Sequence, residues 1–199
     1  RSQKNKTTPL LQMINEEKKL SPLFTLSENI ANGVAPGFQS DGFKRPNNIS
    51  LIKNGLSSGA LISPRSAKEF SLDTNGASMS ESPDSLEVET GDLNRSTILS
   101  TLDTGVFISN LWYLNYSDRS GGRMTGMTRF ATFWVENGKI IAPLKVMRFD
   151  DTIYNMLGEN LQGLTSEQDL LLSASSYFQR STNSARLPGA LINDFRFTL

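Results

Sequence analysis

The densest group of polar side chains in this sequence lies in the 15 residues from Asn115 to Arg129. Arginine guanidinium groups pair with carboxylates, and amides and hydroxyls form hydrogen bonds with peptide groups. An extended peptide can also pair its backbone with the edge of a strand. We therefore predict a substrate-binding surface here, made of Asn115, Tyr116, Arg119, Arg123, Thr125, Thr128 and Arg129.

The same segment also has a purely structural interpretation. Aromatic residues occur in it at strand spacing, and such residues usually form cross-strand pairs and core contacts. These residues are Trp112, Tyr113, Phe130, Phe133 and Trp134. From the residues alone, a binding surface and a long hairpin without a ligand both remain open.

Catalytic chemistry is limited by two absences, because the sequence contains 0 Cys and 0 His. It therefore has no thiol nucleophile, no Ser-His-Asp triad and no imidazole or thiolate ligand for zinc. The adjacent acids Asp150 and Asp151 could bind a hard cation, but a helix cap explains them better. Glu87 and Glu89 fit one solvated face of a strand. We select no catalytic residue and no metal ligand.

Composition narrows the range of partners. The 199 residues include 20 Lys+Arg and 20 Asp+Glu, so the chain lacks the basic excess typical of nucleic-acid-binding proteins. No run approaches the ~18 apolar residues of a membrane span, and no signal-peptide pattern is present. We expect neither a nucleic-acid partner nor a membrane partner. The first residue is Arg1 rather than Met, which suggests a fragment.

The elements that must position the candidate residues are mainly strands. Asn54-Gly55 and Asn137-Gly138 are typical of tight turns between strands, and Ser63-Pro64 is typical of a helix start. Successive segments rich in β-branched and aromatic residues cover 106–116, 127–138 and 139–149, with a capped helix expected at 150–158. We predict an α+β fold that is β-rich, with a mostly antiparallel sheet, a few short helices and a single domain over residues 1–199.

Several motifs together resemble the carboxy-terminal domain of the TldD/PmbA family, also called modulators of gyrase or TldD/TldE peptidases. The longest is WYLNYSDRSGGRMTGMTRFATFWVENGKIIAPLKVMRFDDTIYNMLGEN, at residues 112–160. Shorter ones are APGFQSDGFKRP, LISPRSAKEF, TNGA and LPGALINDFRFTL, in the same order along the chain. The resemblance therefore covers nearly the whole sequence.

The resemblance implies a cytoplasmic bacterial or archaeal protein of two halves, of which this chain is the second. It implies a peptide or unfolded-protein substrate, and a dimer with a TldD-like subunit or with a second copy. Active members are zinc metallopeptidases with an HExxxH helix and a cysteine near the carboxy terminus. The helix motif would fall before Arg1, and the cysteine between Arg180 and Ser184, where this chain reads RSTNS.

This chain departs from the active pattern, because a three-ligand zinc site without its thiolate would be badly weakened. We expect no cofactor in this fragment, with zinc possible only through ligands upstream. The sequence is closer to the zinc-less PmbA/TldE branch, which implies a non-catalytic partner or scaffold in proteolysis and peptide maturation. Two alternatives remain: half of an active zinc metallopeptidase with its HExxxH motif upstream, or a gyrase-modulating binding protein.

Overall fold

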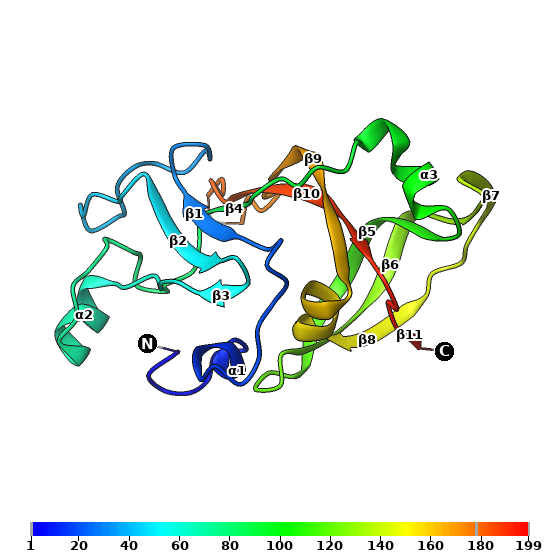
Figure 1. Ribbon diagram of the computed structural model, residues 1–199. Coiled ribbons are helices and arrows are strands. Elements are labelled where there is room, and N and C mark those ends of the chain that lie inside the picture. Colours follow the sequence, from blue (N-terminus) through cyan, green and yellow to red (C-terminus); the bar gives the residue numbers. More distant parts are fainter. Residues whose placement is uncertain (1, 178, 199) are drawn as a thin grey trace. The chain divides into compact units, whose positions relative to one another are not determined.

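The computed structural model describes residues 2–177 and 179–198, and Figure 1 shows their arrangement in strands and short helices. A six-stranded sheet has the order β3-β2-β1-β4-β10-β9. In it, β1 pairs antiparallel with β2 and with β4, whereas β4 and β10 run parallel. Its strands are β1 (Leu26–Asn29), β2 (Asn48–Lys53), β3 (Leu56–Ser57), β4 (Ser85–Val88), β9 (Leu161–Leu172) and β10 (Ser184–Ile192).

A five-stranded sheet carries the long hairpin. Its order is β11-β8-β6-β5, and β7 also pairs with β6. All of the pairings in this sheet are antiparallel. Its strands are β5 (Gly105–Asp118), β6 (Arg123–Glu136), β7 (Lys139–Pro143), β8 (Arg148–Thr152) and β11 (Phe197–Thr198). Strand β5 is therefore an edge strand, 14 residues long.

The helical elements are short. They are α1 (Leu11–Ile14), α2 (Pro64–Phe70), the 3₁₀ turn η1 (Arg95–Thr97), α3 (Ile98–Leu102) and the π-helical turn η2 (Asn155–Glu159). The predicted α+β, β-rich and mostly antiparallel fold is confirmed. No helix within the described residues is long and apolar enough to cross a membrane.

The turn and cap predictions hold where the local chemistry is strong. Asn54 and Gly55 have φ values of 49° and 78° between β2 and β3, and Asn137 and Gly138 have 50° and 70° between β6 and β7. The Ser63 hydroxyl accepts a hydrogen bond from the Ser66 N–H at 3.2 Å and so caps α2. The two predicted turns and the predicted start of α2 are therefore confirmed.

The helix expected from Asp150 to Gly158 is wrong at its start. Asp150 and Asp151 lie in β8, where they pair with β6, and helical residues begin only at Ile153, directly before η2. The Thr152 hydroxyl accepts the Asn155 N–H at 3.1 Å, so Thr152 takes the capping position that we had given to the acids. Pairing with β6 outweighs the local preference of two aspartates for a helix start.

Contacts divide the chain into two compact units. Unit 1 contains residues 22–90 and 168–188, and unit 2 contains residues 2–21, 91–167 and 189–199. Buried apolar side chains of unit 1 include Phe24, Ile30, Ile52 and Val88. Those of unit 2 include Met13, Val135, Phe149, Tyr154, Leu161 and Leu164. Strands β9 and β10 each contribute residues to both units. The single domain expected over 1–199 stays a prediction.

Candidate functional site

The tip of the β5–β6 hairpin is fixed by Asp118. Its carboxylate accepts hydrogen bonds from the Gly121 N–H at 3.1 Å and from the Ser120 hydroxyl at 2.9 Å. The Gly121 and Ser120 bonds favour the ionised form and hold the pKa of Asp118 below its usual value. Gly122 has a φ of 64°, which a glycine adopts without strain. The tip therefore orients the ends of both strands.

Strand pairing assigns the candidate residues to faces of the sheet. Asn115 lies opposite Thr125, and on the other side of β6 Thr125 lies opposite Asp150 and Met127 opposite Arg148. Directly paired residues share a face, and residues two apart in a strand share one as well. We call this face the ribbon face and define it by Trp112, Asn115, Arg123, Thr125, Met127, Arg129, Arg148 and Asp150.

Arg123 is anchored by a neighbouring acid. Its Nη1 donates to the Asp150 carboxylate at 2.9 Å, and the Ser117 hydroxyl donates to the same oxygen at 3.3 Å. The hydrogen bond to Asp150 raises the pKa of Arg123 above its usual value. The β8 residues Arg148 and Asp150 were not in our predicted set, because they are far from the hairpin in sequence. Only the β6–β8 register brings them to it.

Two other arginines are held by aromatic rings rather than by acids. The Arg129 guanidinium carbon lies 3.9 Å from the ring centroid of Trp112 and 4.7 Å from that of Phe130. Arg119 lies 5.3 Å from the Tyr116 ring. Neither arginine forms an ion pair with any residue in the described ranges. Stacking holds the guanidinium plane and leaves its edge available to a carboxylate.

The structure brings Asn115, Arg123, Thr125 and Arg129 to one face, but it places Thr128 elsewhere. Thr128 is 1% exposed, and its hydroxyl accepts the Met147 N–H at 3.0 Å. That hydroxyl therefore holds the chain entering β8 and does not face solvent. Substrate binding by the seven residues stays a prediction, and Thr128 differs from the others in being buried.

The aromatic residues are less buried than the structural interpretation requires. Trp112, Tyr113 and Phe130 are 53%, 71% and 73% exposed, so the expectation of core packing is wrong for them. Phe133 does stack on Phe107, with ring centroids 6.4 Å apart. The reason is that β5 is an edge strand, and bulges interrupt its pairing with β6 at both exposed sites. Exposed aromatics beside arginines are typical of interaction surfaces.

Tyr113 and Phe130 also have left-handed backbone conformations, with φ values of 56° and 59°. Such conformations cost a residue other than glycine about 1–2 kcal/mol. We expect Tyr113→Gly to be about 1 kcal/mol more stable than Tyr113→Ala in urea unfolding, since only glycine relieves the strain. At Leu111, which is extended, the order should reverse. Equal stability of Gly and Ala at 113 would contradict the left-handed conformation.

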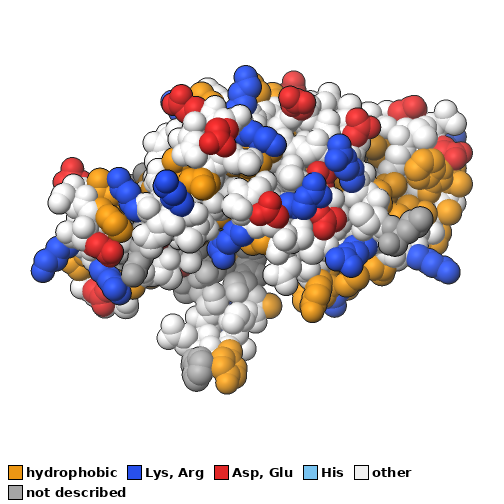
Figure 2. Space-filling model, turned by 90° about the horizontal axis from the view of Figure 1, so that it is seen from below, with side chains coloured by type: hydrophobic (Ala, Val, Ile, Leu, Met, Phe, Trp, Pro, Cys, Tyr) orange, Lys and Arg blue, Asp and Glu red, His pale blue; other side chains and the backbone are white. Residues whose placement is uncertain are grey.

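Figure 2 shows Lys and Arg side chains interspersed with Asp and Glu over the face it presents, with hydrophobic side chains between them. This distribution agrees with a net charge of zero. The local arrangement of the arginines therefore says more about a possible ligand than the net charge of the chain does. On the ribbon face, Arg123 is paired with Asp150, whereas Arg129 is stacked on rings.

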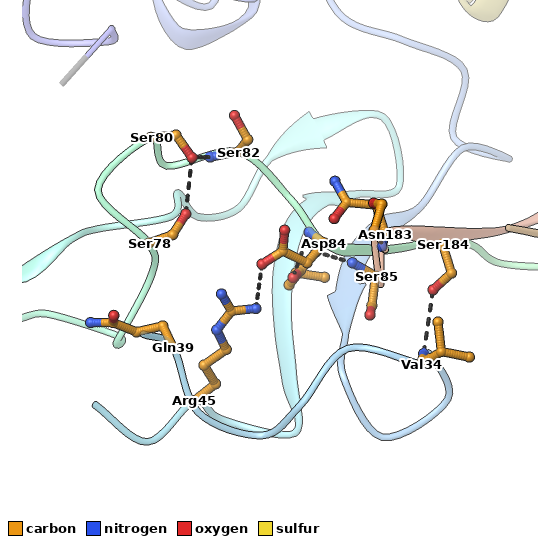
Figure 3. A network of polar contacts seen from close by, with 12 residues as sticks. Val34, Gln39, Arg45, Ser78, Ser80, Ser82, Asp84, Ser85, Asn183 and Ser184 are labelled. Carbon is orange, nitrogen blue, oxygen red and sulfur yellow. Dashed lines mark hydrogen bonds and ion pairs between the residues drawn. The ribbon is translucent and has the colours of Figure 1, made fainter. Parts of the chain in front are cut away.

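The segment where a zinc-binding cysteine was expected forms ordinary hydrogen bonds in unit 1. The Ser184 hydroxyl accepts the Val34 N–H at 3.4 Å, and the Ser184 N–H donates to the Asp84 carbonyl at 2.9 Å (Figure 3). The nearby Asp84 carboxylate is paired with Arg45 at 2.5 Å. A neutral hydroxyl and a carboxylate neutralised by arginine are poor ligands for zinc. No group of three or more acids, Cys or His in the described part of the chain could hold a metal. The residues present do not fit zinc.

The family model described as the PmbA/TldA metallopeptidase C-terminal domain matches residues 1–199. The chain belongs to this family. The predicted recognition of the TldD/PmbA family is therefore confirmed over the whole chain. No curated protein is a significant match to the sequence.

Three solved structures share this fold. TldE from Thermococcus kodakarensis has a TM-score of 0.76 and 16% identity, over 98% of this chain and 46% of its own. A candidate modulator of DNA gyrase from Bacteroides thetaiotaomicron has a TM-score of 0.74 and 21% identity, over 99% of this chain and 41% of its own. A second candidate modulator of DNA gyrase, from Thermotoga maritima, has a TM-score of 0.74 and 15% identity, over 96% of this chain and 42% of its own. The chain thus spans less than half the length of these relatives.

Proposed function

We propose that this PmbA/TldA-type domain belongs to a non-catalytic partner or scaffold subunit that takes part in peptide processing. One observation carries the proposal: a domain of a metallopeptidase family whose sequence has 0 Cys and 0 His. The hydrogen-bonded Ser184 segment is consistent with it, because its groups serve the fold rather than a metal. The fold match to a protein named TldE supports the same branch of the family.

The role we assign to the ribbon face is to hold an extended peptide. The edge of β5 offers backbone groups for strand addition. Arg123 and Arg129 on this face, together with Arg119 in the turn between β5 and β6, offer guanidinium groups for carboxylates. A cytoplasmic peptide or unfolded protein would be the substrate. A TldD-like subunit, or a second copy of this chain, would complete the dimer and would supply any catalytic zinc in the heterodimer.

Two alternatives have specific support. The family description names a metallopeptidase, which favours an active enzyme whose HExxxH ligands lie outside this sequence. Two solved relatives are named as candidate modulators of DNA gyrase, which favours a gyrase-binding role. We rank both below the scaffold role. An active enzyme would need another ligand in place of the cysteine thiolate, and a gyrase-binding role gives no reason for the exposed edge of β5, which can pair with an extended peptide.

Zinc content tests the proposal most directly. The protein from the intact gene would be purified without chelators, and its zinc would be measured by elemental analysis against protein concentration. We expect essentially no zinc per chain. An active zinc-bearing family member, purified in the same way, serves as the positive control. About one zinc per chain would contradict the proposal and would favour the active metallopeptidase.

A further inference from the structure

The ribbon face contains a pocket that our sequence-based prediction did not include. It has a volume of ≈ 250 Å³ and lies at the junction of β5, β6 and β8, where it is lined by Tyr113, Asn115, Thr125, Gly126, Met127 and Arg148.

 A separate groove of ≈ 310 Å³ with a mostly apolar lining lies beside α3. Small-molecule sites typically have ~300–1,000 Å³, so the ribbon-face pocket suits a single side chain of a larger ligand.

Arg148 is the charged group of this pocket, and a hydrogen bond to β6 orients its side chain. Its Nε donates to the Thr125 hydroxyl at 3.2 Å, and that hydroxyl donates to the Phe149 carbonyl at 2.9 Å. The hydroxyl hydrogen is thus used by the carbonyl, which leaves an oxygen lone pair for the arginine. Within the described residues Arg148 forms no ion pair, so the N–H groups on its two Nη atoms can bind an external acceptor.

The other walls of the pocket are largely apolar. Tyr113 and Met127 line the pocket together with Arg148. Tyr113 keeps a left-handed backbone in a bulge of β5 and is 71% exposed. Strained backbone conformations cluster at binding sites. Core packing does not account for the strain at Tyr113, because the side chain of Tyr113 is exposed. The pocket therefore combines one cation, oriented by a hydrogen bond, with an adjacent apolar surface.

We propose that this pocket selects peptides that carry a carboxylate next to an apolar side chain. The carboxylate pairs with the Nη edge of Arg148, and the apolar group packs on Tyr113 and Met127. This inference rests on the proposed peptide binding and names the class of peptide. The carboxylate could come from an internal Asp or Glu, or from the carboxy terminus of the peptide, and the test separates these sources.

The test measures binding of three fluorescent extended peptides to the full chain by anisotropy. The first has an internal Asp beside Leu and an amidated end, the second replaces Asp by Asn, and the third keeps Asn but has a free carboxy terminus. We expect at least one carboxylate peptide to bind about tenfold more tightly than the uncharged one. A preference for the first identifies an internal acid, and a preference for the third identifies the terminus.

Variants then connect this preference to Arg148. Arg148→Gln should reduce the preference to within about twofold, and Arg148→Lys should lose most of it, because lysine cannot form the paired hydrogen bonds. Lys145→Gln removes the same charge from an exposed position outside the pocket and should leave the preference unchanged. Circular dichroism spectra and unfolding curves check that each variant folds, which we expect because Arg148 is exposed.

The outcomes separate this inference from the function on which it rests. If none of the three peptides binds the unmodified chain, peptide binding itself is contradicted. If all three bind equally, or if Arg148→Gln keeps the full preference, the pocket assignment is wrong while peptide binding stands.

Discussion

Replacing Phe149 by alanine should lower the free energy of unfolding by about 3–5 kcal/mol, the largest loss that we expect from a single substitution in unit 2. Phe149 is 1% exposed and lies on β8, between β6 and β11. Its ring centroid lies 5.2 Å from that of Phe195, which in turn packs on Phe197 at 5.1 Å. Alanine would leave a cavity that these rings cannot fill.

The measurement is urea unfolding followed by tryptophan fluorescence, because both tryptophans of the chain, Trp112 and Trp134, lie in unit 2. Phe149→Leu is the matched control, since it keeps most of the apolar volume and should lose much less stability. A loss below about 1 kcal/mol for alanine would contradict the buried position of Phe149. The same residue also positions the pocket, because its carbonyl accepts the Thr125 hydroxyl.

Replacing Glu28 by alanine should lower the stability of unit 1 by about 2–4 kcal/mol. Glu28 is 3% exposed, and its carboxylate accepts the N–H groups of Asp84 at 3.0 Å and of Ser85 at 3.1 Å. Alanine would leave both backbone donors buried without an acceptor. Glu28→Gln keeps one side-chain carbonyl oxygen, so we expect a smaller loss than for alanine.

Hydrogen exchange gives the sharpest reading of this change, because it reports on the two amides themselves. In Glu28→Ala the N–H groups of Asp84 and Ser85 should exchange faster, while amides in the β5–β6 hairpin of unit 2 serve as internal references. Unchanged protection of both amides would show that Glu28 does not hold them in solution. Unfolding followed by circular dichroism then gives the stability itself.

The sequence was most informative where a few adjacent residues determine the backbone. Asn54-Gly55 forms a turn because both residues accept positive φ, and Ser63 caps α2 because its hydroxyl reaches the Ser66 N–H. The class of fold followed from the same reasoning, since short turns between β-rich segments favour antiparallel pairing. Family membership came from the order of several motifs, each of which is weak alone.

The sequence was least informative about which face of each strand is buried. Successive side chains of a strand point to opposite faces, so Thr128 and its neighbour Arg129 cannot lie on the same face. This signal could have removed Thr128 from the candidate site. It could not show that Trp112 and Tyr113 are exposed, because bulges shift the alternation and an edge strand has a paired neighbour on one side only.

The candidate site was also incomplete for a physical reason. Arg148 reaches the ribbon face through the pairing of β8 with β6, where it lies opposite Met127. That register depends on long-range packing rather than on the residues next to Arg148. Asp150 illustrates the same limit, since a local preference favours a helix cap and the pairing places it in a strand beside Arg123.

The interleaving of the two units constrains any attempt to exchange parts between relatives. Unit 1 is made of two chain segments and unit 2 of three, so a single splice point always divides unit 2, and it divides unit 1 as well when it lies between residues 22 and 188. A chimaera that transfers the hairpin with its full unit would need junctions after residues 21, 90, 167 and 188. Recombination at one crossover should therefore yield poorly folded products, and gene-level shuffling of this domain is expected to succeed only when it moves as a whole.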